Sequence, residues 1–483
     1  MTFLGIDLGT SGLRLLLIDE DGKSIASSEA AYPTKQPNFG WSEQDPADWI
    51  KALEDCIAEL SAKEPAFQNM RGIGVSGHMH GAVLLNDEGE IIRPCMMWND
   101  ARSHFEAEKL DAMPEFRSIS GNIVFPGFTA PKLEWLRNNE PENYQKFAKV
   151  LLPAAFLNFY LSGEYIGDIS DASGTSWLNV KDRVWSSELL ESGRVNIEQM
   201  VELVEGCEPA GQLRSELKAS WRLKNDVIIA GGAADNAAAA CGMGAIKDGN
   251  GFVSLGTSGV ILVARDAILP RPELAVHSFC HAVPGTWYQM GVMLSATDSL
   301  NWLARLTDRS PAALTEELGK KIAKPSRLLF QPYLSGERTP HNDALIRGSF
   351  VGLSASTDRK DMTQAVLEGV AFGLRDCMEA LRKAKSSIET LHVIGGGATS
   401  DYWTLLLATV LGEPLNRPTG GEFGAALGAA RLGLVASTER DWQEVMTPPE
   451  SNQCFEPIEQ LSEQFDAAYN RFKDAYPSMR TLA

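Results

Sequence analysis

The chain has 483 residues, 44% of them hydrophobic and 22% charged, which is the composition of a folded protein too large for one hydrophobic core. Its formal net charge of −19 argues against a nucleic-acid or an anionic membrane surface as partner, because both attract clustered cations. The same charge repels nucleotides at long range, so a phosphate site would have to be built locally from main-chain N–H groups, helix ends and Mg²⁺.

The first predicted element is a β-hairpin over residues 5–19, GIDLGTSGLRLLLID, in which two apolar strands flank a turn of small residues. Residues 252–266, FVSLGTSGVILVARD, repeat this pattern without a gap. The repeat distance is about half the chain, far longer than the period of a solenoid. We therefore expect two similar domains, which we assign to residues 1–244 and 245–483.

Strands alternate with helices in the rest of both halves. In chain order, the predicted strands cover residues 24–31, 71–77, 82–86, 91–98 and 391–394. The predicted helices cover about 46–61, 361–382, a segment from about 401, and 420–434, and the charged tail from about 439 is expected to be partly helical. This alternation implies mixed sheets covered by helices on both faces.

Both hairpin turns have the sequence Gly-Thr-Ser-Gly, at residues 9–12 and 256–259. Glycines let main-chain N–H groups approach a phosphate closely, and the neighbouring hydroxyls add donors. One such turn is also common in ordinary tight hairpins. Two identical turns, one in each half, suit a triphosphate held between two domains.

The two hairpins differ at Asp7, whose counterpart in the second hairpin is Ser254. A carboxylate beside a phosphate repels it unless a divalent cation lies between them, and Mg²⁺ binds oxygen ligands while keeping several waters. Asp7 is therefore the predicted Mg²⁺ residue, acting through water. The alternative is an aspartate at a strand end that bonds to its own turn.

Asp235 follows an apolar strand over residues 227–230 and the sequence Gly-Gly-Ala-Ala, and an alanine-rich helix comes after it. A carboxylate within hydrogen-bond reach of a sugar hydroxyl can take its proton as the hydroxyl attacks a phosphate. An aspartate near a helix start is more commonly an N-cap, and this segment alone favours that interpretation.

Two further candidate binding segments lie at the ends of predicted strands. His78 and His80 follow the strand over residues 71–77 and share one face if it continues. A metal pair would lack a third ligand nearby, so sugar binding at the carboxyl end of the strand is favoured. Glycines 395–397 end another strand and suit the approach of adenosine and an α-phosphate. They do not form a Walker A loop, because no Gly-Lys-Ser/Thr follows.

Seven singly spaced cysteines argue against a disulfide framework or a zinc knuckle. No run of 18 apolar residues predicts a membrane span, and the residues before Asp7 do not resemble a signal peptide. We therefore expect a protein of the reducing cytoplasm.

With these residues identified, the chain resembles the FGGY family of carbohydrate kinases, and within that family the bacterial xylulokinases. The resemblance runs nearly end to end and weakens after about residue 437. The segments that carry it include IDLGTSG near the start, GWSEQDP (40–46), HMHGAVLL (78–85), WNDAR (98–102), GNIVFPGFTAPKLEWL (121–136), DISDASGT (168–175), SLGTSGV (254–260), FQPYLSGERTPHND (330–343) and IGGGATSDYW (394–403).

The resemblance implies an α/β protein with the actin-like ATPase fold, in which two ribonuclease-H-like domains enclose a cleft for ATP and a sugar. It implies that Asp235 is the general base, that Asp7 is linked to Mg²⁺, and that a homodimer is one expected assembly. The implied sugar-binding residues are Met79, His80, Asp235 and Asn236. The implied ATP-binding residues are Thr10, Ser11, Thr257, Asn301, Gly396, Gly397 and Asp401.

The expected reaction is phosphorylation of a ketopentose, D-xylulose, by ATP. A sister kinase for ribulose, another ketose or a polyol is the alternative, because His78 and Ala154-Ala155 stand where the resembled kinases usually have Gln and Lys-Asp. An actin-like ATPase switch and an inactive sugar sensor are alternatives of other classes. The intact Asp7, Asp235 and both Gly-Thr-Ser-Gly turns argue against the sensor.

Overall fold

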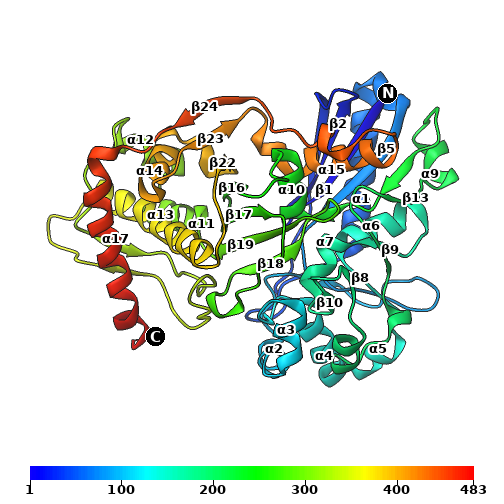
Figure 1. Ribbon diagram of the computed structural model, residues 1–483, viewed down its shortest axis with the longest axis horizontal. Helices are drawn as coiled ribbons and strands as arrows, with labels where there is room; N and C mark the ends of the chain where they lie inside the picture. The colour runs from blue at the N-terminus through cyan, green and yellow to red at the C-terminus, as the bar shows by residue number, and fades with distance from the viewer. Residues whose placement is uncertain (483) are drawn as a thin grey trace.

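The computed structural model describes residues 1–482 and has two α/β lobes, each built on a seven-stranded sheet (Figure 1). The strands of the first sheet are β13 (Pro209–Gln212), β14 (Ile228–Ala230), β5 (Met70–Gly77), β1 (Thr2–Leu8), β2 (Gly12–Asp19) and β3 (Ser24–Ala31), in that order, with β15 (Ala233–Ala234) also paired to β5. Those of the second are β18 (His277–Cys280), β19 (Trp287–Met293), β17 (Gly259–Arg265), β16 (Asn250–Leu255), β22 (Thr390–Ile394), β23 (Leu415–Pro418) and β24 (Ser451–Phe455).

Both predicted hairpins are confirmed. β1 pairs antiparallel with β2, and β16 pairs antiparallel with β17. In each lobe the first strand of the hairpin also has a parallel neighbour, β5 for β1 and β22 for β16. Because parallel strands end at the same edge of a sheet, each Gly-Thr-Ser-Gly turn lies beside the segment that follows the parallel neighbour.

Short strand pairs and helices complete the two lobes. The pairs are β4 (Glu43–Gln44) with β7 (Cys95–Met96), β6 (Val83–Leu85) with β8 (Lys149–Leu151), β9 (Ile166–Asp168) with β12 (Glu202–Val204), β10 (Leu178–Asn179) with β11 (Val184–Trp185), and β20 (Leu329–Gln331) with β21 (Ser349–Val351). The helices of the first lobe are α1 (Pro46–Lys63), α2 (His104–Asp111), α3 (Pro114–Ser120), α4 (Thr129–Asn139), α5 (Pro141–Lys146), α6 (Pro153–Ser162), α7 (Ile169–Ala172), α8 (Ser187–Ser192), α9 (Ser215–Ser220) and α10 (Asp235–Met243). Those that follow are α11 (Thr297–Thr307), α12 (Pro311–Leu318), α13 (Arg359–Lys383), α14 (Asp401–Leu411), α15 (Gly424–Ala436), α16 (Trp442–Val445) and α17 (Glu459–Arg480).

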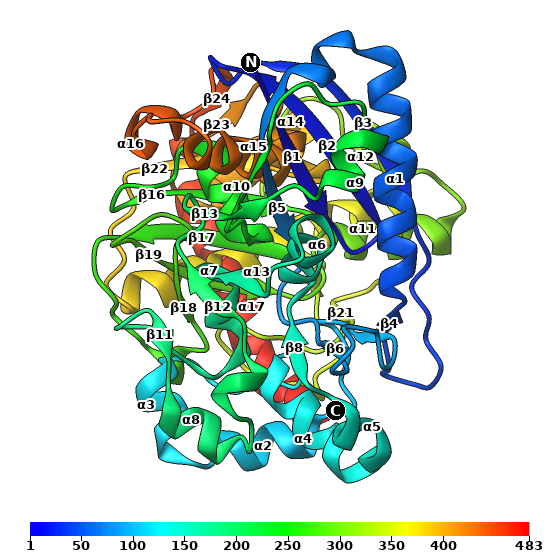
Figure 2. The same cartoon turned by 90° about the vertical axis from the view of Figure 1, so that its right-hand side faces the viewer.

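Most predicted elements are confirmed with small changes at their ends. α1 packs on β2 and β3 (Figure 2), and its start is capped by Asp45, which accepts the N–H of Ala47. The helix expected from residue 420 begins later, at α15, because Gly420 takes a left-handed conformation with φ 71° and a 3₁₀ turn follows it. The strands expected over 82–86 and 91–98 were too long, since only the short β6 and β7 form there.

Helix α15 ties the two lobes together. In the chain it lies between β23 and β24 of the second sheet, yet it packs on β1 and β5 of the first sheet and on α10 (Figure 1). Glycines allow this contact: a Cβ atom on Gly428 would lie 1.8 Å from the carbonyl oxygen of Ala238, and one on Gly74 would lie 1.9 Å from that of Ala429. Since α10 begins at Asp235, this packing fixes the position of that carboxylate relative to β1.

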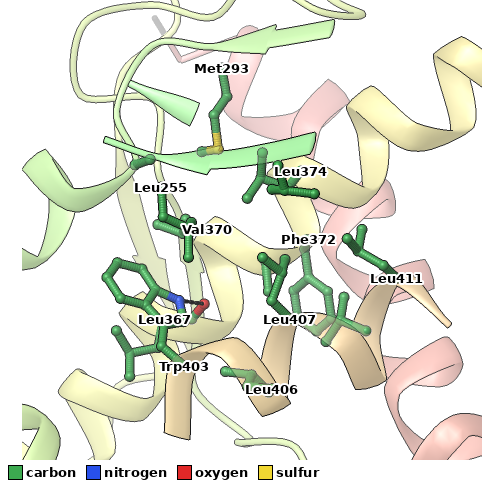
Figure 3. Packing of buried hydrophobic residues seen from close by; sticks show 14 of the residues in the cluster. Leu255, Met293, Leu367, Val370, Phe372, Leu374, Trp403, Leu406, Leu407 and Leu411 are labelled. Carbon is green, nitrogen blue, oxygen red and sulfur yellow. Dashed lines mark hydrogen bonds between the residues drawn. The ribbon is translucent and has the colours of Figure 1, made fainter. Parts of the chain in front are cut away.

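The largest core fills the second lobe between its sheet and helices α13 and α14. Figure 3 shows Leu255 at the end of β16 facing Val370, with Phe372 and Leu407 packed nearby. Trp403 is anchored there by a hydrogen bond from its ring N–H to the Leu367 carbonyl oxygen, at 3.3 Å. The second Gly-Thr-Ser-Gly turn follows Leu255 directly, so it projects from the rigid part of the lobe. No helix within residues 1–482 is long and apolar enough to cross a bilayer.

Candidate functional site

Three parallel strands bring the two predicted catalytic carboxylates to one edge of the first sheet. Asp7 of β1 lies opposite Ser76 of β5, and Ala233 of β15 lies opposite Ser76 from the other side. Neighbouring strands are ~4.8 Å apart, so the main chains at Asp7 and Ala233 are separated by roughly 10 Å. Asp235 follows β15 directly and lies at the same edge.

Asp7 is half-buried, and its carboxylate accepts an internal hydrogen bond. The hydroxyl of Ser76 donates to its Oδ1 at 3.2 Å. Burial raises the pKa of Asp7 to about 6, although the Ser76 hydrogen bond and the charge of Arg14 act in the opposite direction. The group is therefore ionised above about pH 6 and can serve as an oxygen ligand for a hard cation.

Asp235 is the first residue of α10 and is not the N-cap, a position that Ala234 holds. Its Oδ1 accepts the main-chain N–H of Asn236 at 2.7 Å and the side-chain amide of the same residue at 2.9 Å. Burial raises the pKa of Asp235 to about 7, the bonds from Asn236 lower it, and the charge of Asp7 raises it further. A carboxylate with a pKa near neutrality suits a general base at physiological pH.

The strand does not continue past the predicted end at Gly77, so His78 and His80 do not share a face, because the chain turns there. His78 is buried with its ring 5.4 Å from that of Trp49. His80 has φ 69° and points elsewhere, with its ring stacked on Phe128 at a centroid distance of 4.3 Å. Within residues 1–482, no group of three or more His, Cys, Asp or Glu side chains could hold a metal ion.

Met79 and His80 lie where the two lobes meet. The Sδ atom of Met79 is 4.0 Å from the hydroxyl of Tyr288, which belongs to β19 of the second lobe. The Nδ1 atom of His80 is 2.7 Å from the carbonyl oxygen of Gly174, so Nδ1 carries the proton and donates. Burial holds the pKa of His80 well below its usual range, which leaves the ring neutral and Nε2 as an acceptor.

The first Gly-Thr-Ser-Gly turn is held by side chains that sequence reasoning had not assigned to it. The ring N–H of Trp98 donates to the Thr10 hydroxyl at 3.0 Å, and the Gln44 amide donates to the Thr10 carbonyl at 2.7 Å. The hydroxyl of Tyr32 donates to the Gly9 carbonyl. Ser11, at the tip, is exposed.

The second turn is braced by the start of α11. The N–H and the hydroxyl of Thr297 both donate to the Gly256 carbonyl, at 2.9 and 2.8 Å. Thr257 is exposed, and its carbonyl accepts the N–H of Ala296 at 2.8 Å. Gly395 lies against this turn with φ 89°, and a Cβ atom there would be 2.7 Å from the Leu255 carbonyl oxygen. The turn and the glycine segment are thus packed together as one surface.

A pocket with a volume of about 940 Å³ opens beside the second turn. It contains three of the predicted nucleotide residues, Asn301, Gly396 and Gly397. Its other lining residues include Thr297, Leu300, Ser310, Pro311, Thr315, Lys320, Tyr402 and Trp403. The side of the pocket formed by α12 was not predicted, because the short amphipathic pattern of this helix carries no recognisable motif. Asp401 is not among the lining residues, and its carboxylate instead pairs with Arg417 at 2.6 Å.

Comparison with known proteins gives two family matches. The chain matches the N-terminal domain of the FGGY family of carbohydrate kinases over residues 2–242 and the C-terminal domain over residues 251–437. It is 42% identical to a xylulose kinase of Escherichia coli (strain K12) over 439 residues, 90% of each chain.

Solved structures show the same similarity. The crystal structure of a "xyloylose kinase" from Brucella ovis has a TM-score of 0.96 and 52% identity, covering 100% of both chains. A gluconate kinase from Lactobacillus acidophilus has a TM-score of 0.90 at 25% identity, covering 99% of this chain and 98% of that one. Nearly the same fold therefore occurs in kinases named for different sugars.

Proposed function

The chain belongs to the FGGY family of carbohydrate kinases and has its actin-like α/β fold, and on this premise we propose that it phosphorylates D-xylulose with ATP, giving D-xylulose 5-phosphate and ADP. The names of the relatives at 42% and 52% identity support the choice of sugar. The observation that best supports this reaction is that Asp7, the first Gly-Thr-Ser-Gly turn and Asp235 lie at the same edge of the first sheet, where its parallel strands end.

Asp235 acts as the general base. One of its oxygens is held by the two N–H groups of Asn236, which leaves the other to accept the proton of the attacking sugar hydroxyl. The O–H bond of the sugar breaks as its oxygen bonds to the γ-phosphorus, and ADP leaves with the bridging oxygen. The side-chain amide of Asn236 orients the carboxylate and contacts the sugar.

In this proposal, Met79 and His80 line the sugar-binding site. Because Nδ1 of His80 donates to Gly174, Nε2 offers a lone pair to a sugar hydroxyl. The thioether of Met79, buried between the lobes, supplies an apolar surface for the carbon chain of the sugar. This combination of one acceptor and one apolar contact suits a neutral polyhydroxy substrate.

The nucleotide spans both lobes. Thr10 and Ser11 on one side and Thr257 on the other bind the phosphates, and Asn301, Gly396 and Gly397 bind the nucleoside. Asp401, which lies outside the pocket lining, would reach the nucleotide only by leaving its ion pair with Arg417. Asp7 fits a Mg²⁺ held through water, since this ion keeps most of its waters and needs few protein ligands. The ion would supply positive charge to the phosphates. Sugar binding closes the lobes and excludes water from the γ-phosphate.

The proposal is tested by measuring ADP release with a panel of D-xylulose, D-ribulose, D-gluconate and glycerol. D-xylulose should give a kcat/KM at least tenfold above the others, and mass spectrometry should find the pentose phosphate. A higher kcat/KM for another sugar would identify a sister kinase. ATP hydrolysis that is equally fast without any sugar would favour an ATPase switch instead.

A further inference from the structure

The turn at His80 has a conformation that its sequence does not favour. The N–H of Gly81 bonds to the Met79 carbonyl at 2.9 Å, which closes a three-residue turn with His80 at its centre and φ 69°. A residue with a Cβ atom rarely adopts such a positive φ. Strained conformations of this kind persist where the surroundings fix them, and they are concentrated at ligand sites.

Three hydrogen bonds fix the turn from outside. The ammonium of Lys132 donates to the His80 carbonyl at 2.8 Å, and the hydroxyl of Thr129 donates to the same oxygen at 3.2 Å. The ring is held separately by the Gly174 carbonyl at 2.7 Å. Gly174 must lack a side chain, because a Cβ atom there would lie 2.3 Å from Nδ1 of His80 and 3.0 Å from the methyl carbon of Met79.

Lys132 is an unusual residue for a purely structural role. Its side chain is 0% exposed, and its two hydrogen-bond partners are main-chain carbonyls, His80 and, at 2.7 Å, Gly127. Burial lowers the pKa of Lys132 to about 7. Removing an ammonium from water is costly, and an apolar side chain of similar length would fill the same space without that cost. An apolar residue could not donate hydrogen bonds to the two carbonyls, so it could not hold them in this geometry as the ammonium does.

We propose that Lys132, assisted by Thr129, is a positioning residue for sugar recognition. Its donors hold the His80 carbonyl and lock the strained turn, so that Nε2 of His80 and the thioether of Met79 face the substrate in one fixed arrangement. The inference rests on the proposed sugar kinase function. It also assigns a common role to the segments 121–136 and 168–175, because Lys132 and Gly174 from these segments both hold the turn at His80.

The test compares Lys132→Met and Thr129→Val with the wild type by steady-state kinetics. A lost charged hydrogen bond should raise the KM for D-xylulose about tenfold to a hundredfold in Lys132→Met. A lost neutral one should raise it about two- to tenfold in Thr129→Val, which keeps the size of the side chain. The KM for ATP should change less than twofold. Thr129→Ser, which restores the hydroxyl, should restore the KM for the sugar.

Lys149→Met is the matched control. Lys149 on β8 also donates to two main-chain carbonyls of the first lobe, Glu198 at 2.6 Å and Met200 at 3.1 Å, but it does not touch the turn. It should leave the KM for D-xylulose unchanged even if it lowers Tm as much as Lys132→Met does. Should Lys132→Met fail to fold, Thr129→Val and Thr129→Ser decide the question.

Equal KM values for the sugar in the wild type, Lys132→Met and Thr129→Val would overturn the inference, and so would a Thr129→Ser enzyme that behaves like Thr129→Val. Failure of the proposed function is distinguishable from this result, because then the wild type itself would transfer no phosphate to D-xylulose.

Discussion

Replacing Asp235 by Asn removes the proposed base while keeping the size of the side chain. The amide can still accept the N–H of Asn236 through its oxygen, so the start of α10 should keep its geometry. General-base catalysis contributes about 10²- to 10⁴-fold, equivalent to about 3–5 kcal/mol of the activation barrier. We expect kcat for D-xylulose to fall by that factor and the KM for ATP to stay within about twofold of the wild-type value.

The pH dependence gives this prediction a second, independent readout. Burial raises the pKa of Asp235 to about 7, and the base must be deprotonated to act. In the wild type, kcat/KM for the sugar should therefore fall about tenfold per pH unit below 7 and level off above it. Asp7, whose pKa burial raises to about 6, should steepen the fall below pH 6. Asp235→Asn should lose the inflection near pH 7.

The assay couples ADP release to NADH oxidation between pH 5.5 and 9, with the coupling enzymes in excess at each pH. Asp226→Asn is a suitable control, because that carboxylate is exposed and pairs with Lys218, away from the proposed site. An Asp235→Asn enzyme with kcat within fivefold of the wild type, or one that retained the inflection near pH 7, would refute the assignment of the base.

Four further predictions follow from the same structure. Asp7→Asn should raise the Mg²⁺ concentration for half-maximal activity at least tenfold in a Mg²⁺ titration, and an unchanged titration would refute its role. Asp235→Asn should raise Tm at pH 8. The folded-state pKa of Asp235 is raised to about 7, so the stability that this carboxyl group contributes at low pH is lost as the pH rises through 7 and the buried group ionises. The variant cannot ionise, so its gain in unfolding free energy over the wild type, about 1–3 kcal/mol at pH 8, should vanish towards pH 4. Trp98→Phe should raise the KM for ATP about two- to tenfold by removing the donor to Thr10, whereas an unchanged KM would show that the turn does not need this bond. Gly428→Ala should cost about 1–3 kcal/mol in urea unfolding, because its Cβ would lie 1.8 Å from the Ala238 carbonyl oxygen; a neutral effect would mean that α10 and α15 separate easily.

The elements with strong local patterns could be predicted from the sequence. The duplicated hairpins carry alternating apolar strands and turn residues, and the long helix α13 has a clear apolar face, so their positions were correct within a few residues. β24 was missed because its sequence, SNQCF, is short, polar and at the edge of the sheet. Its strand character comes from pairing with β23, which is a long-range contact that no local pattern records.

The site was predictable only in part, for a similar reason. Asp7 and Asp235 adjoin predicted strand ends, and the register of the sheet, which the sequence does not specify, brings them to one edge. No local pattern distinguishes Lys132, because its ammonium binds a turn 52 residues away in the chain. The turn at His80 was not predicted, because nothing in the sequence signals a positive φ at this histidine. The proposed homodimer remains a prediction from resemblance.

A co-crystal structure with a non-hydrolysable ATP analogue, Mg²⁺ and D-xylulose would show whether one nucleotide bridges both lobes in front of the Asp235 base. We expect phosphate oxygens in contact with both Gly-Thr-Ser-Gly turns, and the 5-hydroxyl of the sugar within hydrogen-bond distance of the Asp235 carboxylate. A nucleotide bound to only one lobe, or a sugar whose hydroxyl groups all lie beyond reach of that carboxylate, would contradict it.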